Sequence, residues 1–178
     1  MSVWDSDSQP DAEVTNVANP YEAAPHLVEA LSECPLFHNF STTGIHLLGN
    51  IAREKLIPAG TPLFVENMVA ESFFVVMAGE IVIKANDPNG QSLSLVTLSR
   101  GASFGELGAI CAGRRMCAAI AESDSEVLEI SRRDLGVLQQ TKPQACVKLM
   151  TNINDMFAQR LRESQSEFSA FLAWRLKE

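Results

Sequence analysis

The sequence predicts a mainly β fold, a barrel or a sandwich, with helices before and after it. Between residues 51 and 131, short β-branched and aromatic runs alternate with turn signals such as Asn86-Asp87-Pro88-Asn89-Gly90. This spacing is typical of all-β barrels and sandwiches. Residues 21–50 and 132–178 instead repeat apolar residues at steps of three and four, which predicts helices. At 178 residues, the chain is expected to form one domain with one core.

The first fifty residues are expected to contain an arm and two helices. Residues 1–20 are acidic, rich in Asp, Ser, Asn and Pro, and have no apolar period, so they are predicted to be disordered. The first helix is expected over residues 25–31, and it ends at Cys34-Pro35 because the residue before a proline avoids the helical region. The second helix begins after Ser41, a suitable N-cap residue.

Residues 51–131 are expected to supply the strands. Residues 73–83 are β-branched and aromatic, with a bend at Gly79. Two further strands are predicted at residues 117–121 and 127–130. Beyond the turn at residues 86–90, three leucines are expected to continue the barrel: Leu93, Leu95 and Leu98.

Residues 132–178 are expected to be helical. A short helix over residues 132–140 stops before Pro143, which suits the first turn of a longer helix. That helix carries an apolar stripe that packs on the barrel, pairs with another chain, or does both on different faces: Cys146, Leu149, Met150, Ile153, Met156, Phe157, Ala158 and Leu161. The tail is too apolar for a free end and is expected to pack back or to dock on a partner: Phe168, Phe171, Leu172, Trp174 and Leu176.

Composition argues against several classes of function. The net charge of −8 disfavours nucleic acid as the main partner, because neutralising phosphates requires a basic face. No apolar run of about 18 residues predicts a membrane span, and the N-terminus lacks the segments of a signal peptide. We therefore expect a cytoplasmic protein. The cysteines lack metal-site spacing, and each is expected to pack as a small apolar residue: Cys34, Cys111, Cys117 and Cys146.

The stretch with the clearest chemistry is Phe104-Gly105-Glu106-Leu107-Gly108-Ala109-Ile110, followed by Arg114-Arg115. Its two glycines allow a tight turn and a close approach of the backbone to a ligand. Arg115 can clamp a phosphate through two charge-assisted hydrogen bonds. A carboxylate such as Glu106 fits beside a phosphate when the ligand also presents hydroxyls, as a ribose does. The stretch predicts a nucleotide site, and a surface turn with a solvated arginine pair is the alternative.

This stretch resembles the phosphate-binding cassette of the cyclic nucleotide-binding domain family. The family includes the bacterial catabolite activator protein and the regulatory subunits of cyclic AMP-dependent protein kinase. The resemblance covers about residues 26–164 and includes Ile57-Pro58-Ala59-Gly60-Thr61, Phe73-Phe74-Val75-Val76-Met77-Ala78-Gly79-Glu80 and Glu126-Val127-Leu128-Glu129-Ile130-Ser131. It implies a β-jelly roll over residues 51–131, a cassette at residues 104–118 and a ligand in the mouth of the roll.

The resemblance also implies roles for single residues. Gly105 and Leu107, between Phe104 and Gly108, would offer backbone N–H groups to the ligand. Glu106 would accept from the ribose 2′-hydroxyl, and Arg115 would pair with the cyclic phosphate. On the helix that closes over the ligand, the polar residues expected nearest the base are Arg160 and Ser164.

The cassette departs from the family pattern around its arginine. Met116 and Cys117 follow Arg115, whereas the family usually has a small or hydroxylated residue directly after the arginine. Because a hydroxyl there is the family's usual device for recognising guanine, Met116 favours cyclic AMP over cyclic GMP. Arg114 stands where proline is common. It is either a solvated charge or a second phosphate clamp, and a second clamp would suit a cyclic dinucleotide.

The expected function is a cyclic nucleotide sensor with no catalytic residues and no metal. The chain ends where the activator relatives begin their helix-turn-helix domain, so we expect a stand-alone module without DNA contact, acting through a homodimer or a protein partner. A second hypothesis is a protein-interaction module with a vestigial pocket, motivated by Arg114, Met116 and Ala118. A metal-dependent jelly-roll enzyme needs histidines on its strands, but the three histidines all precede the strands: His26, His38 and His46.

Overall fold

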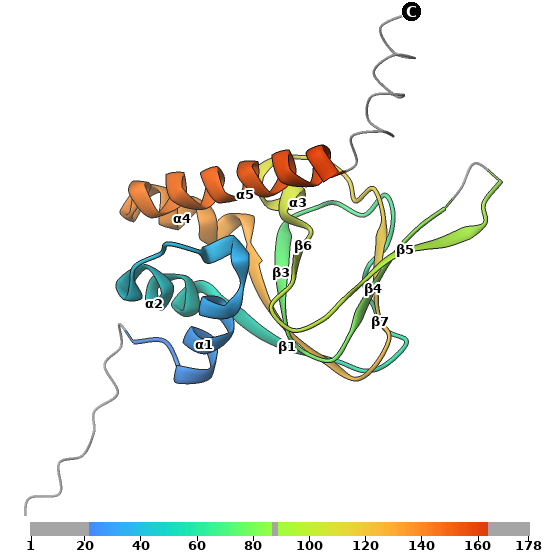
Figure 1. The fold of residues 1–178 in the computed structure, drawn as a ribbon, viewed down its shortest axis with the longest axis horizontal. Helices are drawn as coiled ribbons and strands as arrows, with labels where there is room; N and C mark the ends of the chain where they lie inside the picture. Colours follow the sequence, from blue (N-terminus) through green and yellow to red (C-terminus); the bar gives the residue numbers. More distant parts are fainter. Residues whose placement is uncertain (1–21, 87–88, 164–178) are drawn as a thin grey trace, which may run out of the picture.

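The computed structural model describes residues 22–86 and 89–163, which form two antiparallel four-stranded sheets with helices around them (Figure 1). One sheet has the strand order β1-β8-β3-β6 and the other has the order β2-β7-β4-β5. The predicted β-jelly roll with flanking helices is confirmed. The strands are β1 (Arg53–Ile57), β2 (Pro62–Phe64), β3 (Ser72–Ala78), β4 (Ile81–Asn86), β5 (Ser92–Leu98), β6 (Ser103–Phe104), β7 (Ala118–Ala121) and β8 (Ser125–Ser131).

Strand β3 divides the interior into two clusters. Side chains alternate across a strand, so Phe73 and Val75 face the helices while Phe74 and Val76 face the second sheet. The strand is paired on both sides, with β8 and with β6. One face of β3 is buried under the helices and the other under the second sheet. This explains why residues 73–77 form an unbroken apolar run in the sequence.

The N-terminal helices cover the outer face of the first sheet. They are α1 (Pro25–Glu33), the short 3₁₀ helix η1 (Pro35–Phe37) and α2 (Thr42–Ile51). Ser41 caps α2 as predicted, because its Oγ accepts from the Gly44 amide at 3.2 Å. The positions of Leu31, Leu36 and Leu48, all fully buried, show that these helices complete the core on that side.

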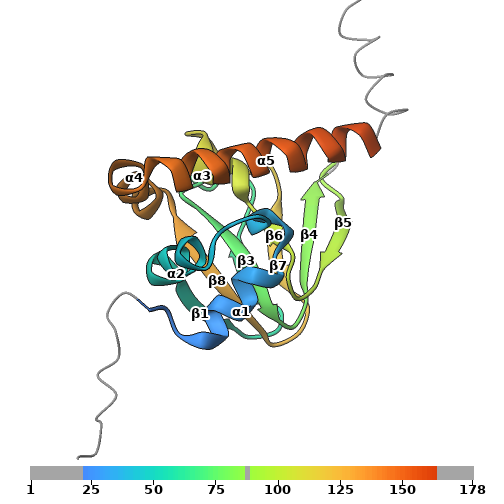
Figure 2. The same cartoon turned by 60° about the vertical axis from the view of Figure 1, so that its left-hand side comes forward.

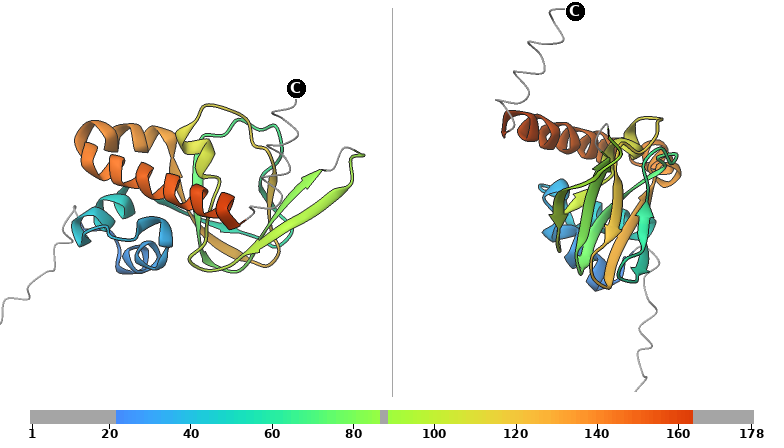
Figure 3. Two further views of the ribbon diagram at one scale, coloured as in Figure 1. Left: turned by 45° about the horizontal axis from the view of Figure 1, so that its top comes forward. Right: turned by 90° about the vertical axis from the view of Figure 1, so that its right-hand side faces the viewer.

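Three more helices lie in the described ranges: α3 (Glu106–Ile110), α4 (Arg132–Thr141) and α5 (Pro143–Glu163). Helix α5 lies across one end of the strands (Figure 2; Figure 3, right). A polar residue anchors it, since Asn152 Nδ2 donates to the Leu36 carbonyl at 2.9 Å and to the His38 carbonyl at 3.2 Å. No helix in the described ranges has the length and apolarity to span a bilayer.

Three apolar residues are exposed although their strand and helix form as predicted: Leu93, Leu95 and Leu161. Leu93 and Leu95 lie on β5 but are 48% and 58% exposed, because β5 is an edge strand and the β4–β5 ribbon reaches away from the body (Figure 1). Leu161 does not join the buried stripe of α5, since it is 46% exposed near the end of that helix. Strand and helix periodicity alone did not predict which of these residues would have another part of the protein packed against them.

Candidate functional site: the cassette cavity

The turn from β6 into α3 requires a glycine at its first position. Gly105 has φ +79°, in the left-handed region, and a Cβ there would lie 2.6 Å from a terminal nitrogen of Arg115. Gly108 is also confined, because a Cβ there would lie 2.7 Å from the Ala70 Cβ and 2.8 Å from the same arginine nitrogen. Both glycines therefore let the backbone close around the Arg115 side chain.

Arg115 is the buried cation of the site. It is 8% exposed. Its Nη2 donates to the Ser72 carbonyl at 2.7 Å and its Nη1 donates to the Gly105 carbonyl at 3.2 Å. The guanidinium lies over the Phe64 ring, 4.0 Å from the centroid, a cation–π contact. Burial lowers the pKa of Arg115 from its ordinary value, but an arginine stays charged in proteins.

One atom of that guanidinium lacks a partner. Among the buried side-chain nitrogens and oxygens of the described residues, Arg115 Nε alone makes no hydrogen bond. A buried donor on a charged group is costly to leave unpaired. An anion in the adjoining cavity would remove that cost and would also compensate the buried charge.

Glu106 faces the same space from the start of α3. It is 3% exposed, and its Oε1 accepts from Ser103 Oγ at 2.7 Å. Arg160 reaches toward it from α5, with 3.9 Å between Arg160 Nη2 and the same carboxylate oxygen. The ion pair connects the cassette to α5, the helix that lies across this end of the strands.

A cavity of about 410 Å³ lies between the cassette, the second sheet and α5, within the size range of small-molecule sites. Its apolar wall includes Ile83, Leu98 and Phe157. The cavity brings together these residues of the predicted site: Phe104, Gly105, Glu106, Leu107, Gly108, Arg114, Arg115, Met116, Cys117 and Arg160. The other predicted residue, Ser164, lies outside the described residues.

The residues around Arg115 differ in their surroundings. Arg114 is exposed, and its Nη1 donates to the Asn67 carbonyl at 2.6 Å. Met116 is 74% exposed at the cavity edge. Burial raises the pKa of the half-buried Cys117 thiol. Cys111, by contrast, is exposed, so the expectation that every cysteine packs as a small apolar residue was wrong.

Several site residues were missed from the sequence. Ser72 and Phe64 hold Arg115 from strands β3 and β2, and Ser103 holds Glu106 from β6. Phe157 was assigned to the apolar stripe of the long helix, whereas it lines the cavity. Ser103 is only two residues before Gly105 on a short strand, so its proximity to the cassette could have been inferred. The other contacts come from distant segments and had no local signal.

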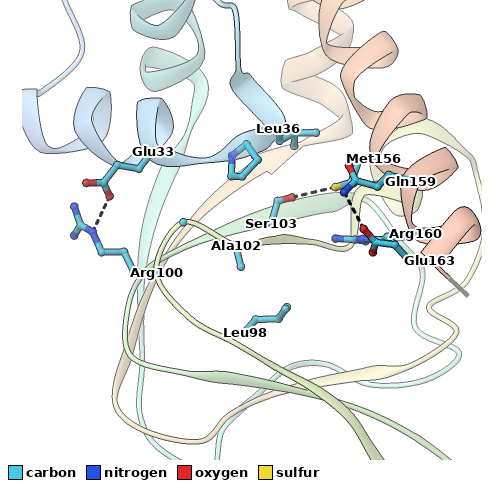
Figure 4. Close-up of a pocket in the computed structure, with 12 residues that line it drawn as sticks. Glu33, Leu36, Leu98, Arg100, Ala102, Ser103, Met156, Gln159, Arg160 and Glu163 are labelled. Atoms are coloured by element: carbon cyan, nitrogen blue, oxygen red, sulfur yellow. Dashed lines mark hydrogen bonds and ion pairs between the residues drawn. The ribbon is translucent and has the colours of Figure 1, made fainter.

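A second cavity of about 460 Å³, the rim cavity, adjoins the first (Figure 4). The two share Leu98, Ser103 and Arg160 as lining residues. On the far side of the rim cavity, Arg100 Nε donates to Glu33 at 2.8 Å. Figure 4 shows this pair opposite the side chains of α5. The described residues contain no cluster of three or more potential metal ligands among His, Cys, Asp and Glu.

The fold and the site together define a class of protein: a jelly-roll ligand-binding domain with a buried arginine in a glycine-rich cassette. The family model of the cyclic nucleotide-binding domain matches residues 54–142, half of the chain. The chain belongs to this family. The match includes the whole cassette and every strand from β2 to β8.

Individual relatives agree with this assignment. The chain is 29% identical over 133 residues to the cyclic AMP receptor protein of Thermus thermophilus, covering 75% of this chain and 60% of the relative. The crystal structure of the Thermus thermophilus catabolite activator protein superposes with a TM-score of 0.69 at 28% identity, over 77% of this chain and 62% of that one. A cyclic nucleotide-binding domain from Methylobacillus flagellatus shares the fold, with a TM-score of 0.71 at 21% identity over 82% of each chain. The chain therefore spans about 60% of the length of the Thermus relative.

Proposed function

We propose that this protein is a regulatory module that binds cyclic AMP in the cassette cavity and signals through α5. The observation that carries the proposal is Arg115, a buried cation whose Nε lacks a partner beside that cavity. A cyclic phosphate supplies the missing acceptor and the compensating charge. The relationship to a cyclic AMP receptor protein supports the same ligand class.

The remaining lining fits the other parts of a cyclic nucleotide. Glu106 can accept a hydrogen bond from a ribose hydroxyl, as the family pattern implies. Ile83, Leu98 and Phe157 provide apolar surface for a base. Met116 supplies no hydroxyl where the family usually recognises guanine, which favours cyclic AMP over cyclic GMP.

The proposed signal is a shift in the population of α5 positions. Arg160 on α5 lies 3.9 Å from Glu106, so a ribose that binds Glu106 competes with Arg160 for the carboxylate. The ligand can move α5 only by as much as it prefers one position over the other. Exposed apolar residues on α5, Val147 and Leu161, offer a surface for a second copy of the chain or a protein partner.

Calorimetric titration of the protein with cyclic AMP and cyclic GMP tests this function. We expect cyclic AMP to bind more tightly. Arg115→Ala should weaken binding by several kcal/mol, while Arg114→Ala, at the neighbouring exposed arginine, should keep the affinity. Wild-type affinity in Arg115→Ala would refute the proposed site, because a buried anion would then be binding without its cation.

A second candidate is a protein-interaction module whose nucleotide pocket is vestigial. It is favoured by the protein acceptors that Arg115 already has, the Gly105 and Ser72 carbonyls, which accept from two of its five N–H donors. Thermal unfolding separates the two functions. A ligand at about 100 times its dissociation constant adds about 2.7 kcal/mol of stability, whereas a vestigial pocket gives no shift with any cyclic nucleotide.

A cyclic dinucleotide is the third ligand to test, because Arg114 lines the same cavity as Arg115. If Arg114 is a second phosphate clamp, Arg114→Ala should weaken dinucleotide binding and leave cyclic AMP binding unchanged. Equal effects on both ligands, or none on either, would exclude the second clamp.

A further inference from the structure

Ser103 lies where three parts of the molecule meet. It is buried on β6, between the cassette cavity and the rim cavity (Figure 4). Its Oγ donates to Glu106 at 2.7 Å and lies 3.9 Å from the Met156 sulfur on α5. Burial raises the pKa of the Cys34 thiol at the end of α1, and the nearby Ser103 hydroxyl acts in the opposite direction. One hydroxyl thus lies near the cassette, the closing helix and the N-terminal helices.

The contacts of Glu106 are all on one side of its carboxylate. Ser103 and Arg160 both approach Oε1. Within the described part of the chain, no hydrogen bond to Oε2 is present, so this oxygen remains available to a ligand. A hydrogen bond from a hydroxyl to a carboxylate is short and strong, and it fixes the orientation of both oxygens.

We propose that Ser103 is a positioning residue for nucleotide recognition: it holds the Glu106 carboxylate so that Oε2 faces the ribose 2′-hydroxyl. The inference rests on the proposed function and adds a residue to it. The physical reason is competition between two donors. The Arg160 guanidinium is half exposed on α5, and without the buried Ser103 hydroxyl it becomes the remaining partner of Oε1 and turns the carboxylate from its position.

The test measures how much the ribose 2′-hydroxyl contributes to affinity in four proteins. Cyclic AMP and 2′-deoxy cyclic AMP are titrated into the wild type, Ser103→Ala, Ser103→Thr and the control Ser99→Ala, whose side chain is exposed on the same connection. In the wild type, removing the 2′-hydroxyl should weaken binding about 10- to 100-fold, the range for a hydrogen bond to a charged group. In Ser103→Ala, this ratio should shrink to about threefold or less, and Ser103→Thr should restore it.

A merely structural role for Ser103 predicts a different result. Ser103→Ala would then weaken both ligands equally and leave their ratio at the wild-type value, which would overturn the proposal. The control Ser99→Ala is expected to keep both the affinities and the ratio.

A measurement without ligand separates this inference from the proposed function. Arg160→Ala is made in the wild type and in Ser103→Ala, and the four midpoints of thermal unfolding form a double-mutant cycle. When the Ser103 hydroxyl is removed, Arg160 becomes the main partner of the Glu106 carboxylate. Arg160→Ala should therefore lower the midpoint of unfolding more in the Ser103→Ala background than in the wild type. An additive cycle contradicts the inference, whereas a coupled cycle in a protein that binds no cyclic nucleotide contradicts only the proposed function.

Discussion

The two adjoining cavities contain arginines in opposite situations. In the cassette cavity, Arg115 is buried and forms no ion pair within the described residues, and burial lowers its pKa. In the rim cavity, Arg100 is exposed, pairs with Glu33 at 2.8 Å and lies 3.7 Å from Glu29. Its hydrogen bond with Glu33 raises its pKa. The cavities have similar volumes, but Arg115 in the first is buried without an ion pair among the described residues, whereas Arg100 in the second is exposed and paired.

The difference shows what makes an arginine a binding group. An exposed arginine in an ion pair contributes little to stability, and its charge is already balanced by water and by its acidic partner. A desolvated cation without an acidic partner is costly in the empty protein and becomes favourable when an anion binds. The cavity around Arg115 is therefore the one suited to a phosphate, and the rim cavity is not.

Replacing each arginine with methionine tests whether the buried and the exposed arginine contribute differently to ligand binding. Arg115→Met should lose about 2–5 kcal/mol of binding free energy, roughly 30-fold to several-thousand-fold in affinity, because a buried anion loses its paired cation. Arg100→Met should leave the affinity for cyclic AMP unchanged. Titration calorimetry of both variants measures the contrast, and similar losses in the two would mean that burial does not distinguish these cations.

The thiol of Cys34, at the C-terminal end of α1, has a pKa that depends on its burial. Burial raises the pKa of Cys34 from its ordinary value of 9.0 to about 11. The unfolded thiol loses its proton near pH 9 and the folded one near pH 11, so the folded state binds more protons between these values. Stability should therefore be intact below pH 9 and fall by about 2–3 kcal/mol as the pH rises to 11.

Denaturant unfolding at pH 8, 9, 10 and 11 measures this decline. In Cys34→Ala, the free energy of unfolding should fall less between pH 9 and pH 11, because this thiol no longer titrates. The smaller side chain also leaves space in the core, which lowers stability at every pH. Cys111→Ala serves as the control because its thiol is exposed. An unchanged slope in Cys34→Ala would show that other groups cause the alkaline loss.

The cassette was predictable from the sequence because its contacts come from neighbouring residues. Gly105, Glu106, Gly108 and Arg115 are within eleven positions, and the turn that joins them depends on local backbone conformation. The jelly roll was predictable from the strand spacing together with the resemblance. Both signals are short-range patterns that a single sequence contains.

The residues that support the cassette could not be predicted, because they reach it through the tertiary fold. Ser72 contacts Arg115 across 43 positions of the chain, and Phe64 lies beneath it from another sheet. The exposure of Leu93 and Leu95 is likewise set by the tertiary fold and not by the local sequence. Their pattern is that of a buried strand, and only the extent of the opposing sheet decides that β5 projects beyond it.

The fit of the cassette around Arg115 predicts unequal effects of adding a methyl group at two glycines. Gly108→Ala should destabilise the protein by about 1–3 kcal/mol, because the new Cβ would lie 2.7 Å from the Ala70 Cβ. Gly136→Ala, inside α4 with open space around it, should stabilise by roughly 0.5–1 kcal/mol through helix propensity. Urea unfolding of both variants gives the comparison, and a stable Gly108→Ala protein would mean that the cassette can relax around Arg115.

The smallest expected effect concerns Arg132, at the start of α4, which connects the cassette to that helix. Its side chain donates to the Gly108 carbonyl in α3 at 3.2 Å, and its backbone amide donates to the Glu71 carbonyl at 2.7 Å. Arg132→Gln removes the guanidinium that donates to Gly108, keeps the backbone bond to Glu71, and should cost about 1 kcal/mol or more. Hydrogen exchange of residues 106–110 should then quicken about fivefold. The adjacent, exposed Arg133→Gln is the control, and equal exchange in the two variants would mean that α4 does not hold the cassette through this arginine.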